Sequence, residues 1–431
     1  MLRDAQLAWE TVHPLGAAQL AWETGIDWRR APIGEEKGES GGRAGLVDEG
    51  ANSDLALGAI RALMTVTTLP MPLDELRKKI DFLDNEMLRL LNERAEVVHG
   101  IGEAKKAAGL MIYAPEREEA LLQALARKNE QLQGRLPEKS VRAIYREIMS
   151  AALALEDDLK IAYLGPEGTW THQAALNKFG RSVEYVPKAN FEDVFDEVAR
   201  RRAHYGVVPI ENSTEGAVNH TLDLFADSPL KICAQILLRI ENCLMAKGPK
   251  EEITVLYSHP QVFGQCRNWL HQHLPQADRV EVSSTTKAAE IAARTPHAAA
   301  LGGALAAQLH GLTVLDRSIQ DSATNTTRFL VLSEKTCPPT GNDRTSLMFS
   351  LRNEPGALFK ALTPFKEFHI NMSKIESRPS KRRDWEYFFF VDILGHVSDP
   401  GLMQALGELE RQCSFVKVLG SYPNTDATAM P

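Results

Sequence analysis

The stretch IAYLGPEGTWTHQAA, residues 161–175, decides how the central part of the chain is organised. Its first four residues are apolar and indicate a short strand, which a Gly-Pro pair ends in a polar turn. The stretch HYGVVPIENS, residues 204–213, has the same form, with an apolar strand, a proline and a polar loop. We expect further strands at Ile232–Ile240, Thr254–Ser258, Ala298–Gly302 and Phe329–Ser333, and helices at Phe191–Arg202 and Thr286–Ala293.

This alternation of strands and helices predicts an α/β domain with a largely parallel sheet. Ligands of such sheets bind at the carboxyl ends of the strands, where the polar loops of this sequence lie. The polar loops are therefore the predicted binding region.

Before this domain, apolar residues recur three and four positions apart from Leu73 to Ile101. This spacing predicts one long amphipathic helix over Leu73–Ala108, and shorter helices follow at Pro115–Asn129 and Pro137–Glu156. Three helices of such unequal length do not close a compact core alone. The long apolar stripe therefore favours pairing with a second copy of the chain.

Two cations share one face of the long helix. Arg94 falls on the apolar stripe, where a surface arginine is unexpected, and Lys105 follows about 16 Å further along the axis. Together they could hold a small dianion, although an ordinary solvated charged face is the alternative. Arg77 lies about 25 Å before Arg94, so it could reach the same ligand only from the partner of an antiparallel dimer.

The C-terminal part forms a separate small domain. Residues 336–343, TCPPTGND, have the composition of a linker. The order of elements after it predicts an α+β domain of about 75 residues. We expect a strand at Ser346–Leu351, a helix at Pro355–Phe368, a strand at Tyr387–Ile393, a helix at Met403–Gln412 and a strand at Val416–Gly420.

Composition excludes several classes of protein. The 431 residues carry a formal net charge of -8, which argues against a general nucleic-acid binder, and no apolar run is long enough to span a membrane. The five cysteines lie far apart without metal-ligand spacing, which favours unpaired thiols in a reducing cytoplasm. We expect no metal site and no cofactor.

Residues 1–70 differ from the rest of the chain. QLAWET occurs twice, at Gln6–Thr11 and Gln19–Thr24, and residues 34–50 are rich in glycine and charge. Such a stretch buries too little apolar surface to offset the entropy of ordering it. We expect a disordered extension without a signal peptide, or an upstream stretch wrongly joined to a start near Met71.

The segments LRKKIDFLD, LLNERAEVV, GEAKK and YAPERE, within residues 73–159, resemble the all-helical chorismate mutases. The resemblance implies an intertwined helical dimer that rearranges chorismate to prephenate without a nucleophile or metal. Fixed charge around a dianion is the physically sensible catalyst of such a pericyclic step. The resemblance implies catalytic roles for Arg94, Lys105 and Glu156, and substrate binding by Arg117, Glu118 and, from the partner subunit, Arg77.

Glu156 stands where the mutase family has Gln or Glu beside the ether oxygen of the breaking bond. A glutamate must be protonated to donate a hydrogen bond there, so we expect mutase activity to fall as the pH rises. Ala114 and Ala152 depart from an acidic residue and a serine that some members have.

Five segments resemble prephenate dehydratase in their order and spacing over residues 160–333. The resemblance implies two α/β lobes, like those of bilobal solute-binding proteins, with prephenate bound between them. The segments are GPEGTWTHQAA (Gly165–Ala175), VPIENSTEGAV (Val208–Val218), SHPQVFGQC (Ser258–Cys266), ALGG (Ala300–Gly303) and NTTRF (Asn325–Phe329).

Loss of a hydroxyl and a carboxylate from prephenate needs a hydroxyl donor and a cation. The family's critical threonine corresponds to Thr327, and Arg328 beside it supplies the cation. Glu211 and His259 are either acid–base groups or supports of their loops. The resemblance further implies substrate contacts from Thr169, Thr171, Asn212 and Ser213.

Residues 353–362, NEPGALFKAL, and residues 374–392 resemble the ACT regulatory module that is fused to dehydratases. This implies allosteric inhibition by phenylalanine, whose carboxylate the free amides at the start of a helix can bind. A turn at ESRP would close over the ligand from a neighbouring subunit, whereas a capped helix and hairpin without a ligand is the alternative. The implied effector-binding residues are Gly356, Ala357, Leu358, Glu376, Ser377, Arg378 and Pro379.

Together these features resemble the bifunctional chorismate mutase/prephenate dehydratases of phenylalanine biosynthesis. We expect a helical mutase domain over 71–158, a bilobal α/β dehydratase domain over 159–336 and a ferredoxin-like α+β ACT domain over 344–424. The expected protein is a cytoplasmic homodimer or higher homo-oligomer that binds chorismate, prephenate and phenylalanine, but neither nucleic acid nor membrane. Two alternatives stay open, a non-enzymatic ligand-binding protein and a dehydratase whose helical domain only dimerises.

Overall fold

The computed structural model describes residues 72–109, 113–381 and 386–425. The chain divides into two compact units, one ending at Ile80 and one beginning at Asp81. Of the first unit only residues 72–80 are described, and nearly all of them belong to the start of a helix. The predicted extension over 1–70 lies outside the described residues.

Three helices begin the described chain, close to where the apolar spacing predicts them. Acidic residues occupy the first turn of the longest helix and lysines its last turn, which suits the helix dipole. Within the described ranges, no helix has the length and apolar character needed to cross a bilayer. The helices are α4 (Leu73–Ala107), α5 (Pro115–Gln131) and α6 (Glu138–Glu156). Many apolar side chains of α4 stay exposed, among them Phe82, Leu83, Met87, Leu88, Leu90, Leu91 and Val97.

The first α/β lobe holds a sheet in the order β2-β1-β3-β11-β5, and β4 pairs with β3. β1 is parallel to β2 and β3, whereas β11 is antiparallel to β3 and β5. β1, β2, β3 and β5 therefore point the same way, as a largely parallel sheet requires, and β11, which returns from the second lobe, runs against them. The strands are β1 (Lys160–Leu164), β2 (Glu184–Lys188), β3 (Tyr205–Asn212), β4 (Gly216–Ala217), β5 (Lys231–Arg239) and β11 (Thr326–Ser333), and the helices are α7 (Trp170–Phe179), α8 (Phe191–Ala199) and α9 (Asn219–Phe225).

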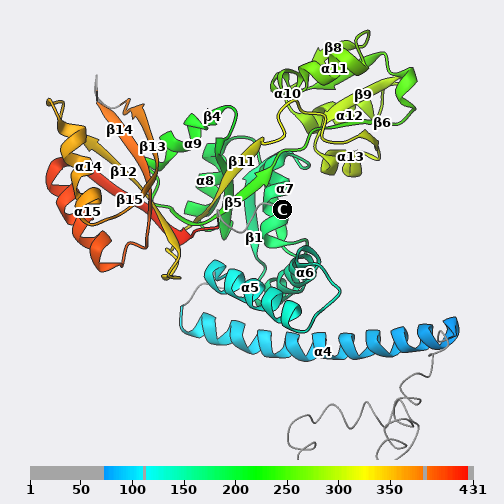
Figure 1. Cartoon of the computed structure of the whole chain (residues 1–431), viewed down its shortest axis with the longest axis horizontal. Coiled ribbons are helices and arrows are strands. Elements are labelled where there is room, and N and C mark those ends of the chain that lie inside the picture. The colour runs from blue at the N-terminus through cyan, green and yellow to red at the C-terminus, as the bar shows by residue number, and fades with distance from the viewer. Residues whose placement is uncertain (1–71, 110–112, 382–385, 426–431) are drawn as a thin grey trace, which may run out of the picture. The chain divides into compact units, whose positions relative to one another are not determined.

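The second lobe holds a five-stranded sheet in the order β10-β6-β9-β7-β8. Helices lie around this sheet (Figure 1). Its strands are β6 (Cys243–Ala246), β7 (Val255–Ser258), β8 (Asp278–Glu281), β9 (Ala298–Gly302) and β10 (Thr313–Asp316), and its helices are α10 (Pro260–Gln265), α11 (Arg267–His273), α12 (Thr285–Ala292), α13 (Ala304–His310) and the short 3₁₀ helix η2 (Lys250–Glu252).

The chain passes between the lobes twice, from β5 to β6 and from β10 to β11. Hydrogen bonds join the two crossings. The N–H of Ile240 donates to the carbonyl of Asn325 at 2.8 Å, and the N–H of Asn242 donates to Oε1 of Gln320 at 2.9 Å. These bonds fix the segment that leads into β11.

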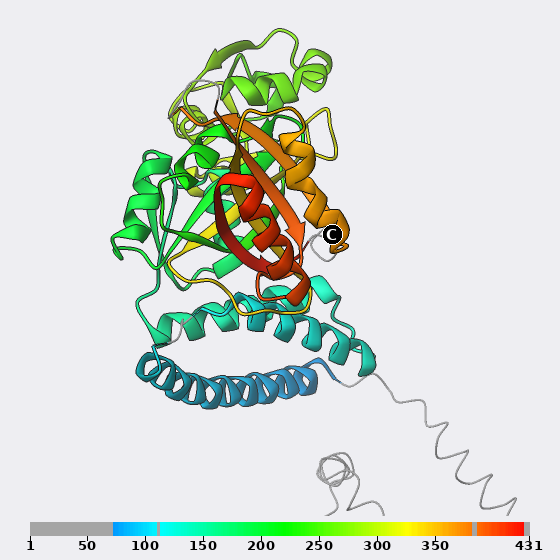
Figure 2. The same ribbon diagram turned by 90° about the vertical axis from the view of Figure 1, so that its left-hand side faces the viewer.

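The C-terminal domain is a four-stranded antiparallel sheet in the order β13-β14-β12-β15. Helices α14 and α15 lie side by side over one face (Figures 1 and 2). Its other face packs against the sheet of the first lobe, where Met348, Phe390 and Leu419 share one apolar core with Ile210 and Leu330. The elements are β12 (Asp343–Leu351), α14 (Ala357–Glu367), β13 (Met372–Pro379), β14 (Tyr387–Leu394), α15 (Pro400–Gln412) and β15 (Cys413–Pro423).

The cysteines are unpaired, as the sequence predicts. All five carry free thiols, and four of them are buried. Burial raises the pKa of the Cys266 and Cys413 thiols to about 12, so these thiols stay protonated at neutral pH.

Candidate active sites

A cleft of about 690 Å³ opens beside the segment that leads into β11. Residues Thr214 and Glu215, which follow β3, line its first-lobe side. Helix α10 and the crossing before β11 line the rest, and the volume suits a small polar ligand. The residues from these two segments are His259, Pro260, Gln261, Gly264, Gln265, Gln320, Asp321, Ser322 and Asn325.

Asn212 and Thr327 meet beside this cleft because β3 and β11 pair them. Nδ2 of Asn212 donates to the Thr327 hydroxyl oxygen at 2.7 Å and to Oδ1 of Asn325 at 2.8 Å. The amide orientation is fixed by Thr214, whose N–H and hydroxyl donate to Oδ1 of Asn212 at 2.9 and 2.6 Å. Because the Thr327 oxygen already accepts one hydrogen, its own hydrogen is left to donate, and no acceptor for it is present among the described residues.

Ser213 holds the segment before β11. Its hydroxyl accepts from the N–H of Thr326 at 2.9 Å and donates to the carbonyl of Thr324 at 3.1 Å. Its contact with substrate therefore stays a prediction. Sequence reasoning missed Asn325 and Gln265 as lining residues, although both lie inside the motifs quoted for the dehydratase resemblance.

The loop before α7 approaches the second lobe closely. Thr169 caps the helix, since its Oγ1 accepts from the N–H of His172 at 3.3 Å. Gly168 has φ +82°, and a Cβ there would come within 3.1 Å of the Thr286 hydroxyl, so this position requires glycine. Neither Thr169 nor Thr171 lines the 690 Å³ cleft, and their substrate contacts stay predictions.

His172 holds this loop in place. Its Nδ1 accepts from the N–H of Gly168 at 3.1 Å, and its ring stacks on Tyr163 with centroids 4.7 Å apart. The ring must be neutral at Nδ1 to accept this bond. Burial lowers the pKa of His172 below its ordinary value of 6.5. The stabilisation is therefore fully present above pH 6.5 and is lost as the pH falls through the lowered pKa.

We expect His172→Asn to make the protein less sensitive to acid, because asparagine keeps an acceptor near Nδ1 but does not titrate. When the pH is lowered from 7.5 to 5, the melting temperature of the wild type should decrease by about 2 °C or more beyond the decrease in the variant. His204→Asn is the matched control, since Nδ1 of His204 accepts from the N–H of Lys160 at 3.1 Å on a more exposed ring. Equal acid-induced losses in the wild type and His172→Asn would contradict this role.

Arg328 does not lie beside the Thr327 hydroxyl, so the predicted substrate-binding cation is not found at that position. Successive residues of a strand face opposite sides of the sheet. The guanidinium of Arg328 therefore lies on the far side of β11, where it donates to Asp392 at 2.6 Å and to the hydroxyl of Tyr422 at 2.7 Å. Both partners belong to the C-terminal domain.

The sequence allows Glu211 and His259 to be either acid–base groups or supports of their loops. In the structure both make supporting contacts. Glu211 forms ion pairs with Arg328 and Lys374, away from the cleft. His259 caps α10, since its Nδ1 accepts from the N–H of Gln261 at 3.3 Å. Of these two, only His259 lines the cleft.

In the helical region, Lys105 and Glu156 form a half-buried ion pair. Lys105 Nζ lies 3.0 Å from the Glu156 carboxylate, and the two side chains are 18% and 7% exposed. The Glu156 side chain packs over Gly102, where an added Cβ would come within 3.0 Å of it. Arg94 is half-buried on the same helix and makes no hydrogen bond or ion pair to another described residue. The predicted proton on Glu156 stays a prediction.

Arg117 and Glu118 point in different directions at the start of α5. Arg117 is exposed, whereas Glu118 is buried and pairs with Lys178 of the first lobe at 3.4 Å. A substrate hydroxyl would have to compete with this ion pair for Glu118. In the first unit, Arg77 is exposed and pairs with Asp74 one turn earlier, at 3.2 Å.

The predicted effector segments lie at two places in the C-terminal domain. Gly356 precedes α14 with φ +79°, and the exposed Leu358 lies in its first turn. Residues 376–379 belong to β13, so the predicted ESRP turn is wrong. Arg378 donates to Asp223 of the first lobe at 2.9 and 3.1 Å. Effector binding by these residues stays a prediction.

Family models match three parts of the chain. They are chorismate mutase type II over residues 76–157, prephenate dehydratase over residues 161–337 and the ACT domain over residues 345–411.

Among curated relatives, a bifunctional chorismate mutase/prephenate dehydratase of Aquifex aeolicus is 49% identical over 353 residues, 81% of this chain and 98% of the relative. The prephenate dehydratase of Arthrobacter aurescens, solved in complex with L-Phe, is similar in structure, with a TM-score of 0.58 and 34% identity over 63% of this chain and 92% of that chain. The quorum-quenching acylase GqqA also has a TM-score of 0.58, at 30% identity over 62% of this chain and 99% of that chain.

Proposed function

Because the chain belongs to the family of bifunctional chorismate mutase/prephenate dehydratases, we propose that it converts chorismate to prephenate and prephenate to phenylpyruvate. The observation that best supports the second activity is the Asn212–Thr327 pair beside the cleft, within the region that matches prephenate dehydratase. Lys105 and Arg94 on one helix, within the region that matches chorismate mutase, support the first.

Prephenate becomes aromatic when its ring carboxylate leaves as CO₂ and its ring hydroxyl leaves as water. The electron pair of the breaking C–C bond enters the ring. The electron pair of the breaking C–O bond leaves with the oxygen, which takes up a proton from solvent and becomes water. The Thr327 hydroxyl donates a hydrogen bond to this leaving oxygen, while Asn212 holds the Thr327 oxygen in position. Thr169, Thr171 and Ser213 are further proposed contacts of the substrate anion.

For the mutase reaction, the substrate dianion binds between Arg94 and Lys105. Fixed cations hold it in a compact reactive conformer and stabilise the charge of the transition state. Glu156 keeps the Lys105 ammonium in place at 3.0 Å and, when protonated, donates to the ether oxygen. Arg117 and Glu118 contribute from α5.

A second copy of the chain completes the helical site. The large apolar side chains of α4 stay exposed after folding, and a stripe of this length is typical of a helix that pairs with a partner. An antiparallel partner would bring its own Arg77 to the dianion held by Arg94. The homodimer is thus part of the proposed active site.

We expect Arg77→Ala and Arg94→Ala to restore each other's mutase activity when mixed. In a mixed dimer one site receives both wild-type arginines and the other receives neither. Random exchange of subunits should then give about a quarter of the wild-type rate. The check is a mutase assay after co-refolding the two variants in equal amounts. A mixture no more active than its components would contradict shared sites.

The C-terminal domain binds phenylalanine, which inhibits the dehydratase. The match to the ACT domain and the L-Phe bound to the Arthrobacter aurescens enzyme support this effector. Gly356, Ala357 and Leu358 at the start of α14 would hold its carboxylate, and Glu376, Ser377, Arg378 and Pro379 would close the site. The reaction needs no cofactor, and the cytoplasm remains the expected location.

The test is to assay the purified full chain with chorismate and with prephenate separately, with and without phenylalanine. We expect both substrates to be consumed, and the dehydratase rate to fall at millimolar phenylalanine or below. Absence of phenylpyruvate from prephenate would overturn the dehydratase assignment, and absence of inhibition would overturn the effector.

A further inference from the structure

Four charged residues join the first lobe to the C-terminal domain. Arg328 and Glu211 are cross-strand partners in the sheet of the first lobe, and Lys374 and Asp392 are cross-strand partners in the C-terminal sheet. Arg328 contacts Asp392, and Lys374 contacts Glu211, so each cation of one sheet meets an anion of the other. We call these four residues the charge quartet.

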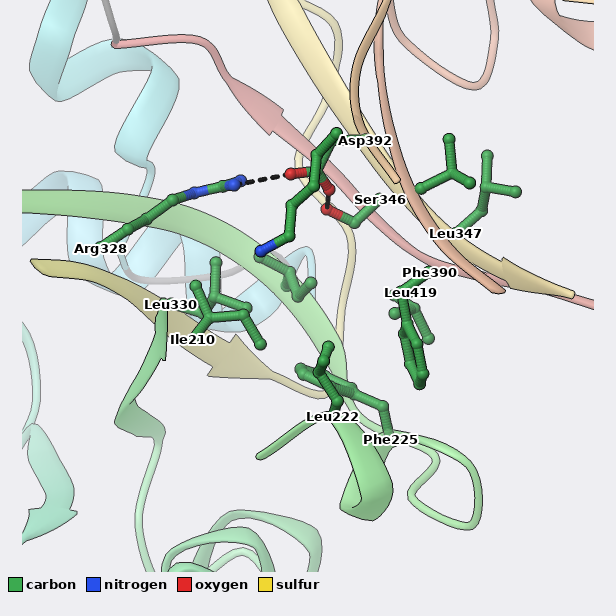
Figure 3. A pocket seen from close by; sticks show the side chains of 13 residues that line it. Ile210, Leu222, Phe225, Arg328, Leu330, Ser346, Leu347, Phe390, Asp392 and Leu419 are labelled. Carbon is green, nitrogen blue, oxygen red and sulfur yellow. Dashed lines mark hydrogen bonds and ion pairs between the residues drawn. The ribbon is translucent and has the colours of Figure 1, made fainter. Parts of the chain in front are cut away.

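Further residues of the C-terminal domain hydrogen-bond to the quartet. The hydroxyl of Ser346 donates to Asp392, and Tyr422 contacts both Ser346 and Arg328. Figure 3 shows Arg328 reaching toward Asp392, whose carboxylate also meets Ser346. Burial would raise the pKa of Asp392, but Arg328 and Ser346 outweigh it and lower that pKa. Asp392 is therefore a buried carboxylate that depends on its partners for its charge.

The boundary around the quartet has no room for a ligand. The side chains of Arg328 and Asp392 are only 5% and 9% exposed. The cavity beside them has about 20 Å³, room for one water molecule at most, and its other walls are mainly apolar. The quartet is an internal contact between two sheets.

The quartet lies directly behind the proposed catalytic pair. Arg328 follows Thr327 in β11, and Glu211 precedes Asn212 in β3. Because successive strand residues face opposite sides, one face of this strand pair presents Asn212 and Thr327 and the other presents the quartet. The pairing of the two strands shifts register immediately after Arg328, where a bulge interrupts the ladder.

We propose that the charge quartet couples the effector site to the dehydratase site. This inference rests on the proposed function. Lys374 lies on β13, two residues before the effector segment that begins at Glu376. Separating a buried charge from its partner costs free energy. If effector binding moves β13 and β14, Glu211 and Arg328 therefore move together with Lys374 and Asp392. The movement would change the distance between Asn212 and Thr327 on the opposite face.

The test compares Asp392→Asn with the wild type as the full chain. Asparagine keeps the size of the side chain but removes the charge that holds Arg328. Dehydratase kcat and KM, the phenylalanine concentration for half-inhibition and phenylalanine binding by calorimetry are measured. We expect kcat without phenylalanine to stay within about threefold, phenylalanine still to bind, and inhibition to weaken by at least about fivefold. Mutase activity should not change.

Lys231→Met is the matched control. Lys231 also joins the two sheets, donating to the carbonyl of Val418 at 2.6 Å, but it lies at the far end of β5, paired with Ser333. Inhibition of this variant should match the wild type. If Asp392→Asn does not fold, Lys374→Met, which removes the other ion pair of the quartet, is judged by the same criterion.

The outcomes separate this inference from the proposed function. If phenylalanine inhibits the wild type and the quartet variants equally, the coupling role is overturned while the proposed function stands. If inhibition weakens to the same extent in Lys231→Met, the quartet has no special role. If phenylalanine does not inhibit the wild type, the proposed regulation fails and the inference fails with it.

Discussion

Thr327→Ala is expected to lower the dehydratase kcat by about 10³-fold while leaving the mutase unchanged. Loss of a hydrogen-bond donor that acts on the leaving group removes stabilisation of the transition state, and such losses are on the order of 10²–10³-fold. The Thr327 hydroxyl is the donor that Asn212 orients beside the cleft. The measurement is the rate of phenylpyruvate formation from prephenate, with prephenate formation from chorismate as the internal reference.

Two variants control for effects on folding. Thr326→Ala removes the same group from the adjacent residue of β11, which faces the other side of the strand, and should keep nearly full activity. Thr327→Ser keeps the hydroxyl and should recover most of the rate. If Thr327→Ala retains more than about a tenth of the wild-type kcat, the proposed role of this hydroxyl is wrong.

Arg94→Ala is expected to lower mutase kcat/KM by on the order of 10³-fold and to leave dehydratase activity on added prephenate intact. Arg94 is half-buried on α4, and no described residue neutralises it, so its charge is available to a substrate carboxylate. Removing a preorganised cation costs both binding and stabilisation of the transition state. Disappearance of chorismate is the measurement.

Arg89→Ala is the control on the same helix. Arg89 is exposed and pairs with Glu86 and Glu93 along the helix, contacts that contribute little to stability. Its mutase activity should stay within about twofold of the wild type. Equal losses in both arginine variants would mean that the helix as a whole, and not the Arg94 charge, had been disturbed.

The sequence predicts the three kinds of domain correctly because each has its own periodicity. Apolar residues three and four apart give α4, and short apolar runs give strands such as β9, where all five residues are buried. The sequence does not predict β2 or β8, with the residues EYVPK and DRVE, because neither has an apolar run. β2 and β8 form because each pairs through its backbone with a neighbouring strand, β1 or β7. This pairing depends on tertiary structure.

The candidate site is predicted less completely, for two physical reasons. Arg328 is adjacent to Thr327, and successive side chains of a strand lie on opposite faces of the sheet. The sequence alone therefore indicates that the two side chains do not contact the same substrate. Glu118 differs, because its partner Lys178 lies 60 residues away and only the docking of α5 on the first lobe brings them together. Motif resemblance identifies residue types but not the face on which each lies.

The most direct test of two activities on one chain is a time course with chorismate as the only substrate, followed by NMR for the wild type and Thr327→Ala. We predict that the wild type forms prephenate transiently and then phenylpyruvate, whereas Thr327→Ala consumes chorismate at the same rate and stops at prephenate. Wild-type protein that leaves chorismate unchanged, or Thr327→Ala that forms phenylpyruvate at the wild-type rate, would contradict the account.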